Sequence, residues 1–161
     1  MTEEKKTASE KLDTENSMIE ELKKSLGDDF IEGKAQRAHR IYVKVKTGSH
    51  HKAIQFMKDN WGLYHLTTIS GADLGENFEV IFHFFVKNMV VNLRTEVPRA
   101  KPRLDTITDI IPGSTLYERE VHDMFGIDFK GHPNLARLEL SDDWPDGVYP
   151  LRKDWKSPEQ K

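Results

Sequence analysis

Cysteine is absent from this chain of 161 residues, and its absence excludes several kinds of chemistry. There can be no disulfide, no thiolate nucleophile and no thiolate ligand for an iron–sulfur cluster, and a zinc ion would have only histidine and carboxylate ligands. If electrons move near this protein, another component carries them.

Long apolar runs, a signal peptide and an excess of positive charge are missing as well. The longest apolar run, residues 80–86, is interrupted by His83 and is shorter than the roughly 18 residues that a membrane-spanning helix requires. The first residues lack the apolar core of a signal peptide, so a cytosolic protein is expected. The 24 basic and 27 acidic residues are spread along the chain without a basic stripe, so nucleic acid is not expected as a partner.

Proline is missing from the first part of the sequence, since all seven prolines occur at Pro98 or later. Regular structure is therefore expected before that point and irregular structure after it. Residues 1–15 have too few large apolar side chains to offset the entropy of ordering, which predicts a disordered leader. The expected organisation is this leader, an α+β domain over residues 16–125 and an extended C-terminal arm over residues 126–161.

Apolar periodicity predicts the elements of the α+β domain. One amphipathic helix is expected from the capping-box residues Ser17 and Glu20 to Gly27, and a second between Ser49 and Gly62. The expected result is a small, mostly antiparallel sheet with helices packed on it and a long irregular C-terminal arm; a short helix over residues 105–111 is also considered. Alternating residues predict four strands, of which the last two form a tight hairpin and the third is central with both faces covered: 39–46, 63–70, 78–87 and 89–97.

A further helix is predicted from a second capping-box candidate, Thr115, to Gly126. Its apolar residues gather on one stripe that faces the core. Its charged residues are expected at the edges of that stripe or on the outer face of the helix: Glu118, Arg119, Glu120 and Asp123.

Three explanations of these charges remain open. A solvated helix would pair Arg119 with Asp123 and Glu118 with His122, each pair contributing about 0.2–0.5 kcal/mol. An acid–base enzyme would use Glu118, Glu120, His122 and Asp123, although catalysis needs convergent groups and neighbouring residues on a helix point in different directions. In the third explanation, another protein completes the pairs.

Residues 126–155 have no clear helical or strand period. Segments of this length without regular structure are uncommon in compact domains unless they are functional or disordered. The segment is rich in Trp, Tyr and Arg, the residue types that dominate interface energetics, which favours an arm that folds against a partner. The alternative is an arm folded back over its own sheet, with Phe129 and Leu135 in the core.

Three groups of residues in this part of the sequence form recognisable motifs: Glu118-Arg119-Glu120 with Asp123, Phe125 and Gly126, then Gly131-His132-Pro133-Asn134-Leu135, and then Arg137 with Pro150-Leu151-Arg152-Lys153-Asp154. Together they resemble the signature of the respiratory complex I 30 kDa subunit family, also known as the C subunit of NADH dehydrogenase. The family includes counterparts in energy-converting membrane-bound nickel–iron hydrogenases. The resemblance extends more loosely upstream to about Ile41.

The resemblance implies a non-catalytic, hydrophilic accessory subunit of a membrane-bound respiratory oxidoreductase complex, of the complex I or hydrogenase type. Such a subunit supports electron transfer coupled to ion translocation from a peripheral place on the cytoplasmic side of the membrane. Its implied partners are the hydrogenase-large-subunit-like (49 kDa-type) subunit and iron–sulfur subunits. Iron–sulfur clusters, and a nickel–iron centre or quinone where present, would be held by those partners, and no cofactor by this chain.

The competing functions are a freestanding acid–base enzyme and a generic protein-interaction domain. For the accessory subunit, the interface is expected to combine the signature residues with the aromatic residues of the arm. The expected interface residues are Glu118, Arg119, Glu120, Asp123, Phe125, Gly126, His132, Pro133, Arg137, Trp144, Tyr149, Leu151, Arg152, Lys153, Asp154 and Trp155.

Overall fold

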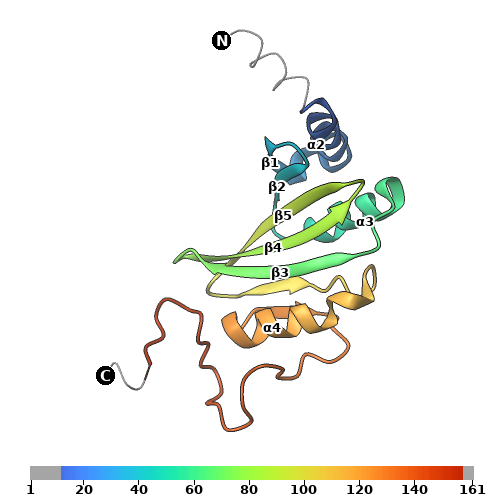
Figure 1. Cartoon of the computed structure of the whole chain (residues 1–161). Coiled ribbons are helices and arrows are strands. Elements are labelled where there is room, and N and C mark those ends of the chain that lie inside the picture. The colour runs from blue at the N-terminus through green and yellow to red at the C-terminus, as the bar shows by residue number, and fades with distance from the viewer. Residues whose placement is uncertain (1–11, 158–161) are drawn as a thin grey trace.

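The computed structural model describes residues 12–157, and the structural statements below refer to that part of the chain. Its helices are α2, Asp13–Leu26; α3, His50–Trp61; and α4, Thr115–Phe125. Its strands are β1, Phe30–Arg37; β2, Arg40–Val45; β3, Leu66–Asp73; β4, Asn77–Val86; β5, Met89–Pro98; β6, Arg103–Asp105; and β7, Asp128–Lys130. Five strands form one sheet in the order β1-β2-β5-β4-β3, while β6 and β7 form a second, so the predicted α+β class is confirmed (Figure 1).

Helix α2 begins earlier than predicted. It starts at Asp13, so the expected start at Ser17 is wrong, and residues 13–15 of the expected leader are helical. The buried carboxylate of Glu15 stabilises this extra turn, because it accepts the backbone N–H of His39 at 2.7 Å. Residues 1–11 lie outside the described residues, and a disordered leader there stays a prediction.

Strand β1 has no counterpart among the predicted strands. It lies at the edge of the sheet, and most of its side chains are exposed on both faces. Its sequence therefore lacks the alternation of apolar and polar residues that predicts a half-buried strand. Helix α2 packs closely on it at Gly33, where an added Cβ would come 2.4 Å from Cγ2 of Ile19. On the other side of β2 lies β5, which pairs with it in parallel and places Ile41 opposite Val91.

The hairpin of β4 and β5 confirms the prediction for this part of the chain. Val86 pairs with Met89, and the two turn residues, Lys87 and Asn88, adopt φ of 50° and 58°. These are the left-handed conformations that a tight two-residue turn requires. The inner face of the hairpin buries Phe78, Val80, Phe82, Phe84, Val91, Leu93 and Val97.

The outer face of the sheet differs from the prediction. Strand β4 is central as predicted, between β3 and β5, but its second face is not covered, since Phe85 is 53% exposed. The reason is that the apolar sides of all three helices join the inner face of the sheet in one core. Figure 1 shows no helix in front of β3, β4 and β5.

Helix α3 confirms the prediction between Ser49 and Gly62, and Gly62 ends it with a left-handed φ of 72°. The helix considered over residues 105–111 is not formed. This stretch begins instead at the end of β6, which pairs in parallel with β7, and continues into a turn.

Nε2 of His50 lies 2.8 Å from the carbonyl oxygen of Asp105 and fixes the end of β6 against α3. None of the helices within residues 12–157 has the length and apolar character needed to cross a membrane.

Candidate protein interface at helix α4

Glu118 is expected at the edge of the apolar stripe, but its side chain is completely buried. The carboxylate accepts hydrogen bonds from the Thr106 hydroxyl (2.5 Å), the Ile107 N–H (2.8 Å) and the Ser114 hydroxyl (3.2 Å). Burial raises the pKa of Glu118 above its ordinary value, and these three donors reduce the rise. The predicted capping box with Thr115 is not formed, because Glu118 holds the preceding loop against α4.

Asp123 is also buried, although the helical pattern places it on the outer face. Its Oδ2 atom accepts the backbone N–H groups of Leu138 (2.8 Å), Glu139 (2.9 Å) and Leu140 (3.3 Å). Burial alone would raise the pKa of Asp123, but these three donors hold it below its ordinary value. The carboxylate is therefore an ionised acceptor for three consecutive amides.

Arg119 lies one helical turn before Asp123 and binds the preceding part of the same stretch. Its Nε donates to the carbonyl oxygen of Ala136 at 2.8 Å, and its Nη2 donates to that of Arg137. The predicted pairing of Arg119 with Asp123 is wrong, and so is that of Glu118 with His122. Arg119 and Asp123 instead bind backbone groups of the chain that follows the helix, and Glu118 binds hydroxyl and N–H groups of residues 106–114.

The arm expected over residues 126–161 is not irregular from its start, because residues 128–130 form β7. The part described after it, residues 131–157 (the C-terminal segment), contains no helix or strand. Part of it is closed into a loop by Arg137, whose guanidinium donates to the carbonyl oxygens of Ser141 (3.0 Å) and Asp142 (3.2 Å) and to the carboxylate of Asp146 (2.5 Å). This loop follows directly on the residues that Arg119 and Asp123 hold. Whether the whole segment is an extended arm docked on a partner stays a prediction.

Arg152 attaches the later part of the C-terminal segment to the end of α4. Its Nε donates to the carbonyl oxygen of Phe125 at 2.8 Å, and its guanidinium lies 4.1 Å from the ring centre of Tyr149 and 5.0 Å from that of Phe78. Gly126 makes room for this arrangement. A Cβ at that position would come 2.3 Å from the Tyr149 ring, and the backbone there has a left-handed φ of 70°.

Asp73, at the end of β3, is a further anchor of the C-terminal segment. Its Oδ2 accepts the backbone N–H of Lys153 and a hydrogen bond from Arg99, each at 2.8 Å. Arg99 also pairs with Asp154 at 3.1 Å. No local pattern identifies Asp73 as a site residue, because these partners lie 26 and 80 positions away in the sequence.

Several apolar side chains stay accessible around α4 and the C-terminal segment. Leu116 is 56% exposed and Leu151 is 55% exposed. Trp144 and Trp155 are half-buried, with ring centres 6.1 Å apart, and together with Val148 they line a hollow of about 590 Å³. Exposed leucines and a tryptophan-lined hollow are the features by which a surface binds another protein.

The other predicted interface residues divide by exposure. Phe125 is buried, and Nε2 of His132 lies 3.1 Å from the carbonyl oxygen of Thr115. The fold-back explanation is confirmed for Phe129, which is buried, and Leu135 packs partly buried against the core. Besides Leu151, the exposed residues of the predicted interface are Glu120, Pro133, Lys153 and Asp154.

The acid–base alternative requires its four groups to converge, and they do not. Glu118 faces the loop before α4, whereas Asp123 faces the C-terminal segment. Nδ1 of His122 lies 2.9 Å from the carbonyl oxygen of Ile127, and Glu120 is exposed. Within residues 12–157, no three His, Asp or Glu side chains are grouped as they would be to hold a metal ion.

Comparison with known proteins relates the chain to subunits of respiratory complexes. The sequence model of the family described as respiratory-chain NADH dehydrogenase, 30 kDa subunit, matches residues 43–161. The C/D subunit of the NADH-quinone oxidoreductase of Phocaeicola vulgatus is 38% identical over 130 residues, which are 78% of this chain but only 22% of that longer protein. Membrane-bound hydrogenase subunit beta of Pyrococcus furiosus is 33% identical over 122 residues, 73% of this chain and 70% of that protein.

A solved structure resembles the chain over most of its length. It is a chain of the membrane-bound sulfane sulfur reductase, described as an archaeal respiratory membrane complex. The TM-score is 0.80 at 25% identity, and the match covers 91% of this chain and 88% of that one. These matches confirm the resemblance carried by the motifs of α4 and the C-terminal segment.

Proposed function

Because the chain belongs to the respiratory-chain NADH dehydrogenase 30 kDa subunit family, we propose that it is a hydrophilic, non-catalytic accessory subunit of a membrane-bound respiratory oxidoreductase complex. Its relatives are named as subunits of an NADH-quinone oxidoreductase and of a membrane-bound hydrogenase. Membership of the family identifies the kind of assembly and leaves the electron donor and acceptor open.

In this proposal, α4 and the C-terminal segment pack against the hydrogenase-large-subunit-like (49 kDa-type) subunit and adjoining iron–sulfur subunits, on the cytoplasmic side of the membrane. Iron–sulfur clusters, and a nickel–iron centre or quinone where present, belong to those partners. This chain aligns the partner subunits, and electron transfer coupled to ion translocation takes place in them.

The observation that carries the proposal is the set of hydrogen bonds by which Arg119 and Asp123 hold residues 136–140. A segment without helix or strand loses conformational entropy when it is ordered by a partner. The hydrogen bonds from Arg119 and Asp123 order residues 136–140 before a partner binds. They therefore reduce the conformational entropy that is lost on binding. Leu151 stays exposed and Trp144 half-buried, so both side chains are accessible for contact with another subunit.

The test uses the full-length, affinity-tagged chain expressed in its native host, with the complex purified from detergent-solubilised membranes. Leu151→Glu places a charge on the accessible surface and keeps the backbone N–H of Leu151 that donates to the Met124 carbonyl at 3.2 Å. Tyr64→Glu is the matched control, since Tyr64 is 87% exposed and lies outside the C-terminal segment.

We expect Leu151→Glu to reduce co-purification of the 49 kDa-type subunit about tenfold, which corresponds to roughly 1.4 kcal/mol. The control should retain that subunit at the wild-type level, and both purified variants should unfold at the wild-type temperature. Equal retention in the two variants would contradict the proposed place of the interface.

A further inference from the structure

The outer face of the five-stranded sheet has two hollows, of which only one has a carboxylate in its lining. Their linings include residues of β2 and β5 that alternate with the core residues of those strands, such as Tyr42, Asn92 and Glu96. Figure 1 shows no helix in front of β3, β4 and β5. One lies near the end of β2 and β5, and the other near their beginning, beside the hairpin partner of β5. This face is opposite to the one against which Phe125 of α4 packs.

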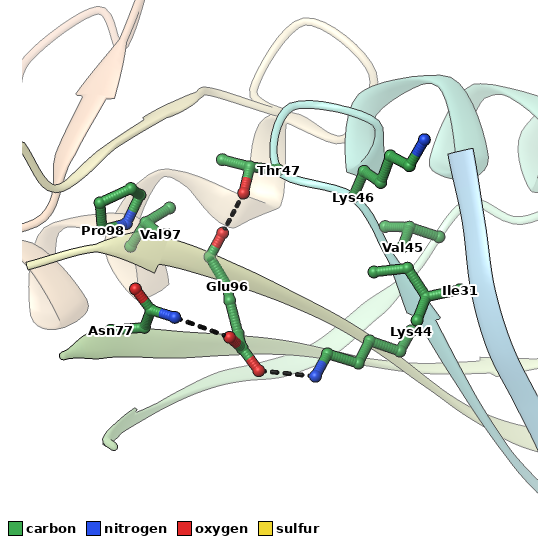
Figure 2. Close-up of a pocket in the computed structure, with 9 residues that line it drawn as sticks. All are labelled: Ile31, Lys44, Val45, Lys46, Thr47, Asn77, Glu96, Val97 and Pro98. Carbon is green, nitrogen blue, oxygen red and sulfur yellow. Dashed lines mark hydrogen bonds and ion pairs between the residues drawn. The ribbon is translucent and has the colours of Figure 1, made fainter. Parts of the chain in front are cut away.

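The first hollow, of about 460 Å³, is lined by two cations, Lys44 and Lys46, and by one carboxylate, Glu96, which is already paired. Nζ of Lys44 lies 2.6 Å from Oε1 of Glu96, and the amide of Asn77 donates to Oε2 at 3.0 Å (Figure 2). These two donors, opposed by burial, hold the pKa of Glu96 below its ordinary value. An acidic ligand bound here by Lys46 would lie beside the Glu96 carboxylate, so we place no site for an acidic ligand in this hollow.

The lining of the second hollow, of about 490 Å³, includes two hydrogen-bonded polar side chains, His83 and Asn92, and the cation of Arg40. Nδ1 of His83 lies 2.7 Å from Oδ1 of Asn92, and the amide nitrogen of Asn92 donates to the Ile41 carbonyl at 3.1 Å. The guanidinium of Arg40, by contrast, makes no ion pair or hydrogen bond with any of residues 12–157.

An apolar surface lies beside that cation. Phe85 is directly opposite Val90 in the β4–β5 ladder, and both side chains line the second hollow. Phe85 is 53% exposed, which is unusual for a phenylalanine inside a sheet strand. No carboxylate belongs to the lining, so the hollow offers a positive charge next to an apolar patch.

We propose that this hollow docks a segment of another protein subunit that carries an aspartate or glutamate next to an apolar side chain. The carboxylate binds Arg40, whose planar guanidinium presents two parallel N–H donors to it. The apolar side chain covers Phe85 and Val90. A nucleic acid would require several cations instead of one. The surface is separate from α4 and the C-terminal segment. The inference rests on the proposed function in one respect, since the partner is expected to belong to the same complex.

The first experiment compares full-length tagged variants in complexes purified from native membranes. Arg40→Glu changes a side chain that makes no ion pair or hydrogen bond within residues 12–157, and Phe85→Ser removes a half-exposed ring. Thermal unfolding of both purified variants checks that they remain folded. We expect each to reduce retention of one particular subunit about tenfold, the change in affinity that loss of a charge-assisted hydrogen-bond pair or a buried aromatic ring produces. The matched controls are Lys24→Glu and Tyr64→Ser, which change an exposed cation and an exposed aromatic outside the hollow and should retain every subunit.

A photo-crosslinking experiment identifies the occupant. Phe85→p-benzoylphenylalanine, introduced into the full-length chain and irradiated within the purified complex, should attach to a peptide of another subunit that has an aspartate or glutamate beside the attachment point. Changing that acidic residue to arginine should then restore retention in Arg40→Glu.

Three outcomes would overturn the inference: attachment to a second copy of this chain, attachment to the chain itself, and wild-type retention of all subunits in both Arg40→Glu and Phe85→Ser. If the wild-type chain itself retained no other subunit, the proposed function would fail instead, and the two failures are therefore distinguishable.

Discussion

The carboxylate of Asp73 accepts the backbone N–H of Lys153 at 2.8 Å, across 80 positions of sequence. The same oxygen accepts a hydrogen bond from Arg99, which follows β5 and also pairs with Asp154. One carboxylate thus joins the end of β3, the chain after β5 and the C-terminal segment. The residues that resemble a partner-binding signature are positioned, in part, by contacts inside their own chain.

Asp73→Ala should lower the free energy of unfolding by about 1–3 kcal/mol, because it leaves Arg99 and the Lys153 N–H without their acceptor. Denaturant unfolding measures that loss, and faster hydrogen exchange at Lys153 shows where it occurs. The control is Asp59→Ala, which removes only an exposed hydrogen bond from Gln55 (2.9 Å) and should cost less than about 0.5 kcal/mol. Equal losses in the two variants would show that Asp73 is not an anchor.

Gly126→Ala should destabilise the protein more than Gly62→Ala. Both glycines end a helix with a left-handed φ, 70° and 72°, so a strain of about 1–2 kcal/mol is common to both. Only at Gly126 would the new Cβ meet neighbours, 2.3 Å from the Tyr149 ring and 2.6 Å from Nη2 of Arg152, whereas nothing lies within 4 Å of it at Gly62. We expect a difference of about 1–3 kcal/mol in unfolding free energy. A difference of zero would mean that Tyr149 and Arg152 do not pack there.

Glu118→Gln should change how stability depends on pH. Burial raises the pKa of Glu118, so the folded protein binds this proton more tightly than the unfolded chain, whose pKa is about 4.3. The contribution of Glu118 to stability therefore falls as the pH rises from that value through the folded pKa, and is constant above it. Glutamine keeps an acceptor for the Ile107 N–H without a charge. Urea unfolding is measured for both proteins at about pH 4 and at about pH 7. Between these values the unfolding free energy of the wild type should fall relative to that of Glu118→Gln. An equal difference in unfolding free energy at the two pH values would contradict this.

His50 should make the protein less stable in mild acid. The side chain is fully buried, its Nδ1 has no partner within residues 12–157, and burial lowers its pKa below the ordinary value. The unfolded chain binds the proton near pH 6.5 and the folded protein only at lower pH, so stability is complete above about pH 6.5 and falls below it. The fall is at most about 1.4 kcal/mol per pH unit.

The variant His50→Gln provides the comparison for that pH dependence. Its amide can still donate to the carbonyl oxygen of Asp105, which Nε2 of His50 approaches at 2.8 Å, and it does not titrate. Urea unfolding between about pH 5 and pH 7 should give a smaller slope for His50→Gln than for the wild type. If the unfolding free energies of the two proteins changed equally with pH, groups other than His50 would be responsible for the loss of stability in acid.

Local sequence patterns correctly predicted helix ends and the hairpin turn, because these features depend on residues that are close together in the sequence. Gly62 and Gly126 end helices because glycine adopts a left-handed φ without strain, and Lys87 and Asn88 make a turn that fits a short hairpin. Strand β1 and the first turn of α2 could not be predicted in this way. Their residues are stabilised by contacts such as that between Glu15 and His39, 24 positions apart.

Periodicity and motifs were enough to predict the α+β class, the helix α4 and the family. The role of the charged residues of α4 became clear only from the folded chain. Helical periodicity places Asp123 on the outer face, but the backbone N–H groups of residues 138–140 come to lie over it and bury it. The physical reason is that periodicity depends on bonds between near neighbours. Whether a carboxylate faces water or amides depends instead on where a distant part of the chain is folded.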